Sequence, residues 1–337
     1  MGLGKKKILS QGASGIVGTD NFAPKLYTGN GGTKNVTGVG FAPDFVWVKD
    51  RDTAYQHNIY DSIRGATKAL EPNSSTAQYT LSGLTSFDSD GFTVGGNAGN
   101  NQANSPNIAW CWKAGGAASS NTSGSITSQV SANQDAGFSI VKYAGTQASG
   151  ATVGHGLSSA PEMIIAKRID NAEDWVVYHS SVGNTKTLNL NNGDAEVTDS
   201  AFNNTTPSST VFTLDNCASG SCINSNSGNY IAYCFTSITG YQKIGSYVGT
   251  GGSISAINVG FEPRFVMIKS TGNTSGNWAM LDNQRLGTSL HQLSANGTHA
   301  EYTNQGVTFT STGFSPRQSQ SGDTNTSGVT FIYLAIK

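Results

Sequence analysis

The sequence predicts an all-β protein made of three tandem β-sandwich or jelly-roll-like modules of about 100 residues each. Glycine accounts for 42 of the 337 residues, and only 12% of the residues are charged. Gly, Asn, Ser and Thr are poor residues for helix interiors, whereas aromatic and β-branched runs between Gly-rich turns are typical of short strands. A motif that recurs three times, with the same landmarks around it, divides the chain into three copies.

The repeated motif surrounds three prolines. The first copy reads Gly-Phe-Ala-Pro-Asp-Phe-Val-Trp-Val-Lys at 40–49, and the third reads Gly-Phe-Glu-Pro-Arg-Phe-Val-Met-Ile-Lys at 260–269. A weaker middle copy at 159–167 keeps the proline and, six residues later, the lysine. The prolines are separated by roughly the length of one domain, which indicates a copied domain and excludes a short solenoid repeat.

Each copy ends in a predicted strand, at 108–113, 231–235 and 331–337. In the first two, large Ile, Trp, Tyr or Phe residues alternate with Ala and Cys, which predicts a strand packed on both faces. We expect Trp110, Tyr233 and Tyr333 to be equivalent in these strands. The run from Phe45 to Val48 predicts a central strand that ends in water at Lys49.

We therefore expect the recurring lysines Lys49, Lys167 and Lys269 to be solvated strand ends that discourage edge pairing. A functional role for this repeated residue is the alternative. The predicted boundaries give an N-terminal attachment segment at 1–24, a first module at 25–115 and a Gly/Ser/Thr-rich linker at 116–136. A second module at 137–239 and a third at 240–337 follow. We expect the first two modules to be flexibly joined and the last two to be rigidly coupled.

Composition and motifs exclude several classes of function. The formal net charge of −1 offers no basic surface for nucleic acid, and no stretch of 18 apolar residues is present to cross a membrane. The N-terminus has too short an apolar segment for a signal peptide, so synthesis in the cytoplasm is expected. The five histidines form no metal-binding pattern, and no nucleophile elbow or P-loop occurs. We therefore predict no catalytic residue, cofactor or metal.

Two acidic pairs and four cysteines remain to be interpreted. Asp50 and Asp52 have the residue types of a glycosidase pair, and 88–91 resembles the start of a calcium loop, but turns are the favoured interpretation of both. Cys111 and Cys234 alternate with bulky residues and are expected to be buried. The segment 217–222 has a cysteine at each end, and whether these two form a disulfide is left open.

Four segments of the first copy resemble a module that recurs in virion proteins of tailed bacteriophages, notably those of marine bacteria. They read GFAPDFVWVKDR at 40–51, IYDSIRG at 59–65, LTSFDSDGFTV at 84–94 and IAWCWK at 108–113. The resemblance is specific over residues 22–116 and weaker in the other copies.

This resemblance implies a non-enzymatic virion component, made in the host bacterial cytoplasm, such as a tail fibre or another external appendage for host-cell attachment. A capsid decoration protein and a carbohydrate-binding module or glycan hydrolase are the alternatives. Expected partners are other virion proteins and a host surface glycan or protein, with a homo-oligomer, in particular a trimer, as the assembly.

The candidate binding residues lie in the loops before the three closing strands, which we expect to face outward because adhesive loops vary on a rigid scaffold. They are Asn97, Asn101, Asn104, Ser219, Asn224, Asn226, Gln320, Asp323 and Asn325. The candidate virion-attachment residues are Lys5, Lys6 and Lys7.

Overall fold

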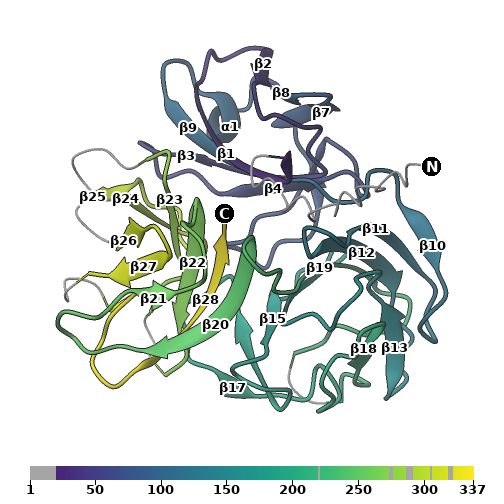
Figure 1. Cartoon of the computed structure of the whole chain (residues 1–337). Coiled ribbons are helices and arrows are strands. Elements are labelled where there is room, and N and C mark those ends of the chain that lie inside the picture. The colour runs from purple at the N-terminus through teal and green to yellow at the C-terminus, as the bar shows by residue number, and fades with distance from the viewer. Residues whose placement is uncertain (1–19, 219–220, 273–275, 286–290, 304–305, 318–321) are drawn as a thin grey trace, which may run out of the picture.

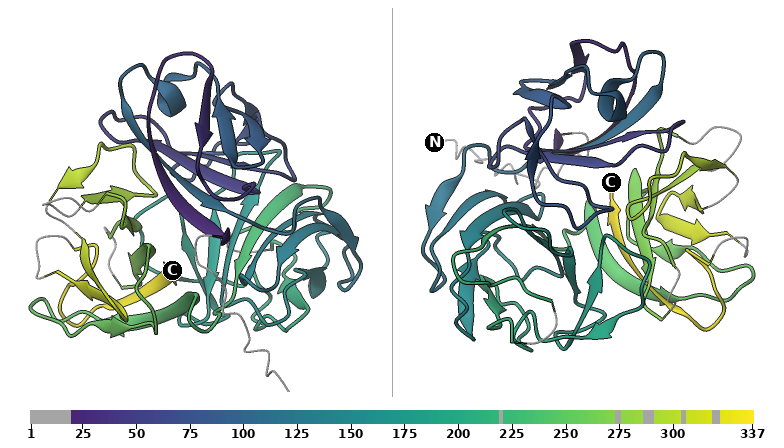
Figure 2. Two further views of the ribbon diagram at one scale, coloured as in Figure 1. Left: turned by 45° about the horizontal axis from the view of Figure 1, so that its top comes forward. Right: turned by 180° about the vertical axis from the view of Figure 1, so that it is seen from behind.

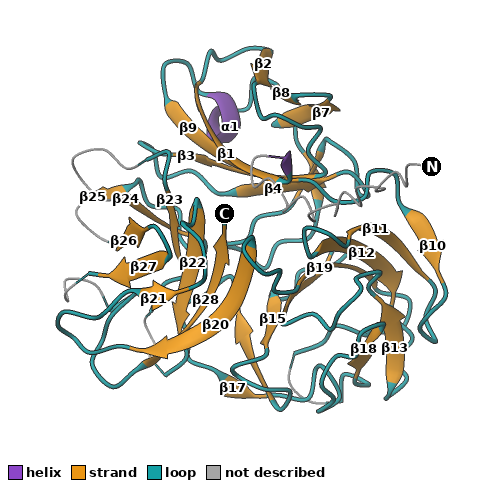
Figure 3. Cartoon of the chain, in the orientation of Figure 1, coloured by secondary structure: helices purple, strands orange, loops and turns teal. Residues whose placement is uncertain are grey.

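The computed structural model describes residues 20–218, 221–272, 276–285, 291–303, 306–317 and 322–337. Strands account for nearly all of the regular structure in these residues, with a single short helix, α1 (Ala98–Asn101) (Figure 3). The all-β prediction is confirmed.

Three large sheets share one antiparallel strand order. The first sheet has the order β1 (Phe22–Thr28), β9 (Pro106–Trp112), β3 (Phe45–Asp50) and β4 (Asn58–Asp61). The second contains the matching strands β12 (Phe138–Ala144), β19 (Asn229–Phe235), β14 (Met163–Arg168) and β15 (Val176–His179). In the third they are β20 (Gln242–Val248), β28 (Thr330–Ile336), β22 (Phe265–Ser270) and β23 (Ala279–Asp282).

Further strands extend two of these sheets. The second sheet adds β10 (Ser119–Asn121) and β11 (Ser128–Asn133) at one edge, and β16 (Lys186–Asn189) and β17 (Val197–Thr198) at the other. The third sheet adds β24 (His291–Ser294) and β25 (Tyr302–Thr303). In the first repeat, β5 (Lys68–Ala69) and β6 (Tyr79–Thr80) form a separate pair.

A smaller sheet accompanies each large one. These sheets are β2 (Lys34–Thr37), β8 (Gly91–Val94) and β7 (Leu84–Asp88); β13 (Ala151–Gly154) and β18 (Val211–Leu214); and β21 (Ile257–Asn258), β27 (Gly313–Pro316) and β26 (Val307–Thr310). Between the two sheets of each repeat lies a separate apolar core. In the first repeat, Val48 and Cys111 of the large sheet share this core with Phe92 of the small one.

The other face of every large sheet contributes to one central core. This core includes Trp110 and Trp112 from the first repeat, Tyr233 from the second and Phe265 and Leu334 from the third. Figures 1 and 2 show the result as three lobes arranged around a common centre. A cavity of about 10 Å³ is lined by residues of all three repeats, and such a volume holds at most one water molecule.

The closing strands have the predicted two packed faces. Ile108, Trp110 and Trp112 enter the central core, whereas Ala109 and Cys111 face the core of their own repeat. The expected equivalence of Tyr333 with Trp110 is wrong by one residue. Leu334 pairs with Met267 as Trp110 pairs with Trp47, so Leu334 occupies the equivalent position. Tyr333 faces the core of the third repeat instead.

The segment 116–136 is not a flexible linker. Its residues form β10 and β11, and β11 pairs along its length with β12. Val130 is buried in the core of the second repeat, so alternation of buried and exposed positions, and not mean composition, decides the structure of this segment.

Candidate functional site: the junctions between repeats and the end loops

A large ring from one repeat enters the next at each junction. Trp175 lies directly before β15 and donates its indole N–H to the carbonyl oxygen of Glu71 in the first repeat at 2.9 Å. Trp278 lies directly before β23 and donates to the carbonyl oxygen of Asn189 in the second repeat at 2.9 Å. His57 has the equivalent place before β4, where it is fully buried and stacks on Trp110. Burial lowers its pKa well below the usual value, so the ring is neutral.

An asparagine side chain fixes the backbone of each of these three ring residues. Its side-chain oxygen accepts the backbone N–H of the ring residue at 2.8 to 3.2 Å. The pairs are Asn73 with His57, Asn191 with Trp175, and Asn296 with Trp278. The same asparagine hydrogen bond therefore positions the ring residue before the fourth strand of the shared order in all three repeats.

The lysines at the second-last positions of β3, β14 and β22 are buried, which contradicts their predicted solvation. Lys49, Lys167 and Lys269 have no exposed surface. Lys167 donates to the carbonyl oxygen of Ser75 in the first repeat at 3.2 Å, and Lys269 donates to that of Gly193 in the second at 3.1 Å. Burial lowers the pKa of each lysine to about 8, although nearby carboxylates oppose the shift. These lysines tie a strand end to a neighbouring loop.

Two buried Asp–Arg pairs receive a hydrogen bond from the closing strand of the adjacent repeat. Asp61 pairs with Arg64 at 2.5 Å and accepts the hydroxyl of Tyr233 at 2.8 Å. Asp282 pairs with Arg285 at 2.6 Å and accepts the indole N–H of Trp110 at 2.9 Å. Burial opposes the charge on Arg64, but Asp61 and Tyr233 favour it more, so its pKa is raised.

The second repeat has a histidine at this position. His179 ends β15 as Asp61 ends β4, and its Nε2 lies 3.5 Å from the carbonyl oxygen of Tyr333 in the third repeat. All three junctions therefore use the last residue of the same strand. The sequence contains a signal for two of them, since an Asp followed three residues later by an Arg occurs in both the first and third copies.

Glu301 adds an ion-pair network between the first and third repeats. One of its carboxylate oxygens lies 2.6 Å from Arg51 of the first repeat, and the other lies 2.6 Å from Arg285. Burial raises the pKa of Glu301, but the two arginines lower it more, and the net shift is downward. A carboxylate held by two guanidinium groups is fully neutralised and is a structural anchor.

Three predicted outward-facing asparagines are buried, so that part of the prediction is wrong. Asn101, Asn224 and Asn325 have no exposed surface. Each side chain accepts a backbone N–H from the loop after the first strand of its repeat, at 2.8 or 2.9 Å. Each also donates its amide to carbonyl oxygens across the loop. These residues hold the loops in shape and are not available to a ligand.

The other predicted loop residues divide into three groups. Asn104 and Asn226 are exposed, as predicted, and Asn97 is half-buried. Asp323 is buried and accepts hydrogen bonds from Asn277 and Gln292. Ser219 and Gln320, together with the attachment candidates Lys5, Lys6 and Lys7, lie outside the described residues.

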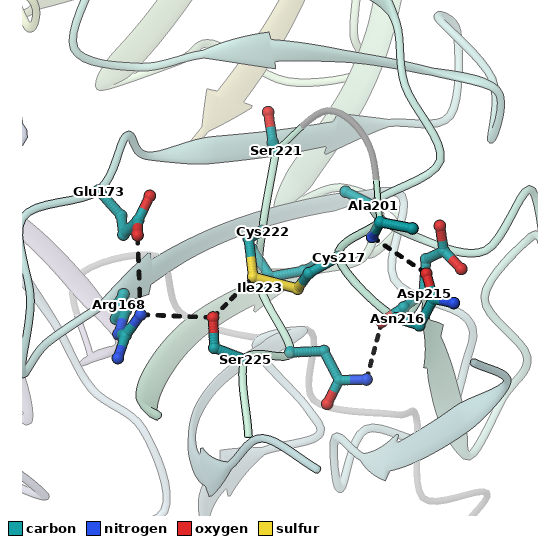
Figure 4. Close-up of a disulfide and its surroundings, with 12 residues drawn as sticks. Arg168, Glu173, Ala201, Asp215, Asn216, Cys217, Ser221, Cys222, Ile223 and Ser225 are labelled. Atoms are coloured by element: carbon teal, nitrogen blue, oxygen red, sulfur yellow. Dashed lines mark hydrogen bonds and ion pairs between the residues drawn. A yellow bond between two sulfur atoms is a disulfide. The ribbon is translucent and has the colours of Figure 1, made fainter. Parts of the chain in front are cut away.

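A disulfide joins Cys217 and Cys222 across the loop that precedes β19 (Figure 4). The sulfur of Cys222 lies 2.9 Å from the hydroxyl of Ser225, which also accepts a bond from Arg168 at 3.3 Å. Cys111 and Cys234 are buried free thiols, as predicted. Burial raises the pKa of both thiols, so neither has the thiolate character of a reactive cysteine.

The acidic residues considered for chemistry are used in turns. Asp50 is buried and accepts the backbone N–H groups of Asp52 and Thr53 and the hydroxyl of Ser105. Asp90 accepts two backbone N–H groups from the 38–40 turn, which lower its pKa. Within the described residues, no group of three or more His, Cys, Asp or Glu side chains could hold a metal ion.

Comparison with known proteins places the whole three-repeat unit in one family. A family model described as a domain of unknown function (DUF7483) matches residues 17–337. The chain belongs to the DUF7483 family. The DUF7483 match runs through all three repeats, in agreement with their shared core. No curated protein and no solved structure matches the chain. Among the described residues, no helix is long and apolar enough to span a membrane.

Proposed function

We propose that this protein is a non-enzymatic structural component of a tailed-bacteriophage particle, most simply a tail fibre or another external appendage that takes part in host attachment. The assignment to a phage rests on the resemblance of residues 22–116. The observation that carries the structural role is the interlocking of the repeats, in which Trp175 and Trp278 each bond to the backbone of a neighbour.

Interlocked repeats support a scaffold role because the buried carboxylates at their junctions are already engaged. Asp61, Asp282 and Glu301 are each paired with arginine, and Asp50 is saturated by backbone and hydroxyl donors. A catalytic carboxylate must instead be free to meet a substrate. Exposed Asn104 and Asn226 lie on loops held by this scaffold, where binding residues are commonly carried.

We also propose that each repeat is a β-sandwich module derived from one ancestral copy. The common strand order and the paired large and small sheets favour this origin. A homotrimer remains our proposal for the assembly, although three copies in one chain already bury the central faces of the large sheets. Sedimentation at several concentrations will give the oligomeric state.

Immunogold electron microscopy of purified phage particles tests the proposed location. Antibodies against the purified chain should label a tail fibre or appendage, and the free protein should compete with particles for adsorption to host cells. Labelling over the capsid would instead favour a decoration protein. Absence of the chain from particles, measured by mass spectrometry, would refute a virion role.

A further inference from the structure

An asparagine followed by a glycine is prone to spontaneous deamidation, and the sequence contains this pair three times, at 30–31, 192–193 and 296–297. In this reaction the backbone nitrogen of the glycine attacks the Cγ atom of the asparagine, and the side-chain amide leaves as ammonia. Glycine permits the attack because it has no side chain to obstruct the close approach of its backbone. The reaction therefore needs two free groups, the glycine N–H and the asparagine Nδ2.

The first pair is held by hydrogen bonds at both reacting groups. Gly31 donates its N–H to the carbonyl oxygen of Asn101 at 2.8 Å. The Nδ2 of Asn30 donates to the carbonyl oxygen of Thr33 at 3.1 Å, and its Oδ1 accepts from Gly32 and Asn101. Ring closure at Asn30 must break these bonds first, which slows the reaction.

The third pair is held in the same way. Gly297 donates its N–H to the carbonyl oxygen of Ser294 at 3.0 Å. The Nδ2 of Asn296 donates to Oδ1 of Asn277 at 3.0 Å, and its own Oδ1 accepts the backbone N–H of Trp278 at 2.8 Å. The asparagine that positions Trp278 is therefore also protected from deamidation.

The middle pair is free at both reacting groups. Within the described part of the chain, neither the N–H of Gly193 nor the Nδ2 of Asn192 donates a hydrogen bond. The Oδ1 of Asn192 accepts the N–H of Asp194 at 3.1 Å, and this donor stabilises the negative charge that develops on the oxygen during attack at Cγ. Both Asn192 and Gly193 are partly exposed between β16 and β17, so water can reach them.

We propose that Asn192 is the site at which this chain deamidates through a cyclic imide. The Gly193 nitrogen loses its proton to hydroxide and forms a bond to Cγ of Asn192, and the Cγ–Nδ2 bond breaks as the amide takes a proton from water and leaves as ammonia. Water then opens the imide at either carbonyl carbon, which gives aspartate or isoaspartate. Each step is a substitution at a carbonyl carbon, so no oxidant or reductant takes part. The isoaspartate product has one additional carbon in its backbone.

This modification acts on the junction between the second and third repeats. The carbonyl oxygen of Gly193 accepts a hydrogen bond from Lys269 of the third repeat at 3.1 Å, and the N–H of Glu196 donates to the carbonyl oxygen of Thr271 at 2.9 Å. An additional backbone carbon directly before Gly193 displaces its carbonyl oxygen from Lys269. The buried ammonium group then keeps only the carbonyl oxygen of Ser270, and loss of a partner is costly for a buried charge. Deamidation therefore loosens this junction.

Peptide mapping by mass spectrometry during incubation of the full chain in neutral buffer tests the site. Asn192 should deamidate at least about ten-fold faster than Asn30 and Asn296, because each of those must first release its hydrogen bonds. The three rates should converge in guanidinium chloride, and isoaspartate should accompany aspartate at position 192. Equal rates in the folded chain, rates that stay apart in the denaturant, or aspartate as the sole product would each overturn the proposal.

Hydrogen exchange at two junctions tests the structural consequence. The Glu196 amide bonds across the second junction, and the Glu173 amide bonds across the first, to the carbonyl oxygen of Ser75 at 3.0 Å. In chains that carry isoaspartate at position 192, exchange at Glu196 should be at least about ten-fold faster than in the unmodified chain, and exchange at Glu173 should be unchanged. The control is Asn192→Gln, which would have to close a larger ring and should keep slow exchange at Glu196 after the same incubation. Unchanged exchange at Glu196 in the isoaspartate form, or equally fast exchange in incubated Asn192→Gln, would refute the loosening of this junction by deamidation.

Discussion

Lys49, Lys167 and Lys269 each follow an apolar run near the end of a strand, yet none is exposed. The Lys167 ammonium group donates to the carbonyl oxygen of Ser75, and that of Lys269 donates to the carbonyl oxygen of Gly193. Both acceptors belong to another repeat. The local sequence does not show that another repeat will bury the lysine, because a lysine after an apolar run can equally well be exposed to solvent. Burial of an ammonium group is tolerated here because backbone carbonyl oxygens replace its water ligands.

The buried lysines should make stability depend on pH. The pKa of Lys167 is about 8 in the folded chain and near its ordinary value of 10.5 when unfolded. Between these values the unfolded chain holds more protons, so stability rises with pH, and below pH 8 the cost of the buried charge is fully present. From pH 7 to pH 9, the wild type should therefore gain about 1 kcal/mol relative to Lys167→Met.

Denaturant unfolding of both proteins at each pH measures this difference. Other groups that titrate in this range, including the cysteines, are common to the two proteins and cancel in the comparison. Parallel stability curves for the wild type and Lys167→Met would contradict the burial of this lysine.

Neighbouring asparagines in one loop should respond very differently to replacement. Asn224 is buried and makes three hydrogen bonds, and loss of such a set leaves backbone groups unpaired. We expect Asn224→Ala to lower the free energy of unfolding by about 2 to 4 kcal/mol. The matched control is Asn226→Ala, at an exposed position two residues away, which should change the free energy of unfolding by less than about 0.5 kcal/mol. Equal effects in urea unfolding would show that Asn224 does not clasp the loop.

At the scale of elements, the sequence predicts the strands that have strong alternation. Ile108, Trp110 and Trp112 alternate with small residues, and β9 has the predicted packing on both faces. The prediction from the sequence fails for β10 and β11, because Ser, Thr and Asn are common both in linkers and in polar edge strands. Only the pairing of β11 with β12 decides between the two. The interlocking residues were also missed, since their contacts join positions between 76 and 250 residues apart.

The close pairing of β2 with β8 depends on a glycine that begins β8. Gly91 has φ of +149°, and a Cβ atom there would lie 2.0 Å from the carbonyl oxygen of Val36 on β2. Gly91→Ala must therefore separate β2 from β8, with an expected loss of at least about 2 kcal/mol. Gly32→Ala is the control, because nothing lies within 4 Å of its Cβ position. If thermal unfolding gave the two variants the same midpoint, the close approach of β2 to Gly91 would be wrong.

At the scale of the whole molecule, the three repeats behave as one body because they share the central core. Each large sheet buries one face against its own small sheet and the other against its neighbours. A single repeat would expose large rings such as Phe265 and Trp278, which are buried in the complete chain. The expected flexible joining of the first two modules is therefore replaced by an expectation that all three repeats unfold together.

The replacement Trp110→Ala tests whether the three repeats unfold together. Trp110 is fully buried, bonds to Asp282 of the third repeat and lies 5.5 Å from the Arg285 guanidinium. Truncating such a tryptophan typically costs about 3 to 5 kcal/mol, and here it also leaves Asp282 without its indole partner. Because the lost stability belongs to the shared core, calorimetry should show a single unfolding transition for the wild type and for Trp110→Ala. The transition of the variant should lie at a lower temperature. Val248→Ala, at an exposed position on β20, should leave the transition unchanged. Two separate transitions in Trp110→Ala, with the third repeat melting as in the wild type, would show that the repeats are independent domains.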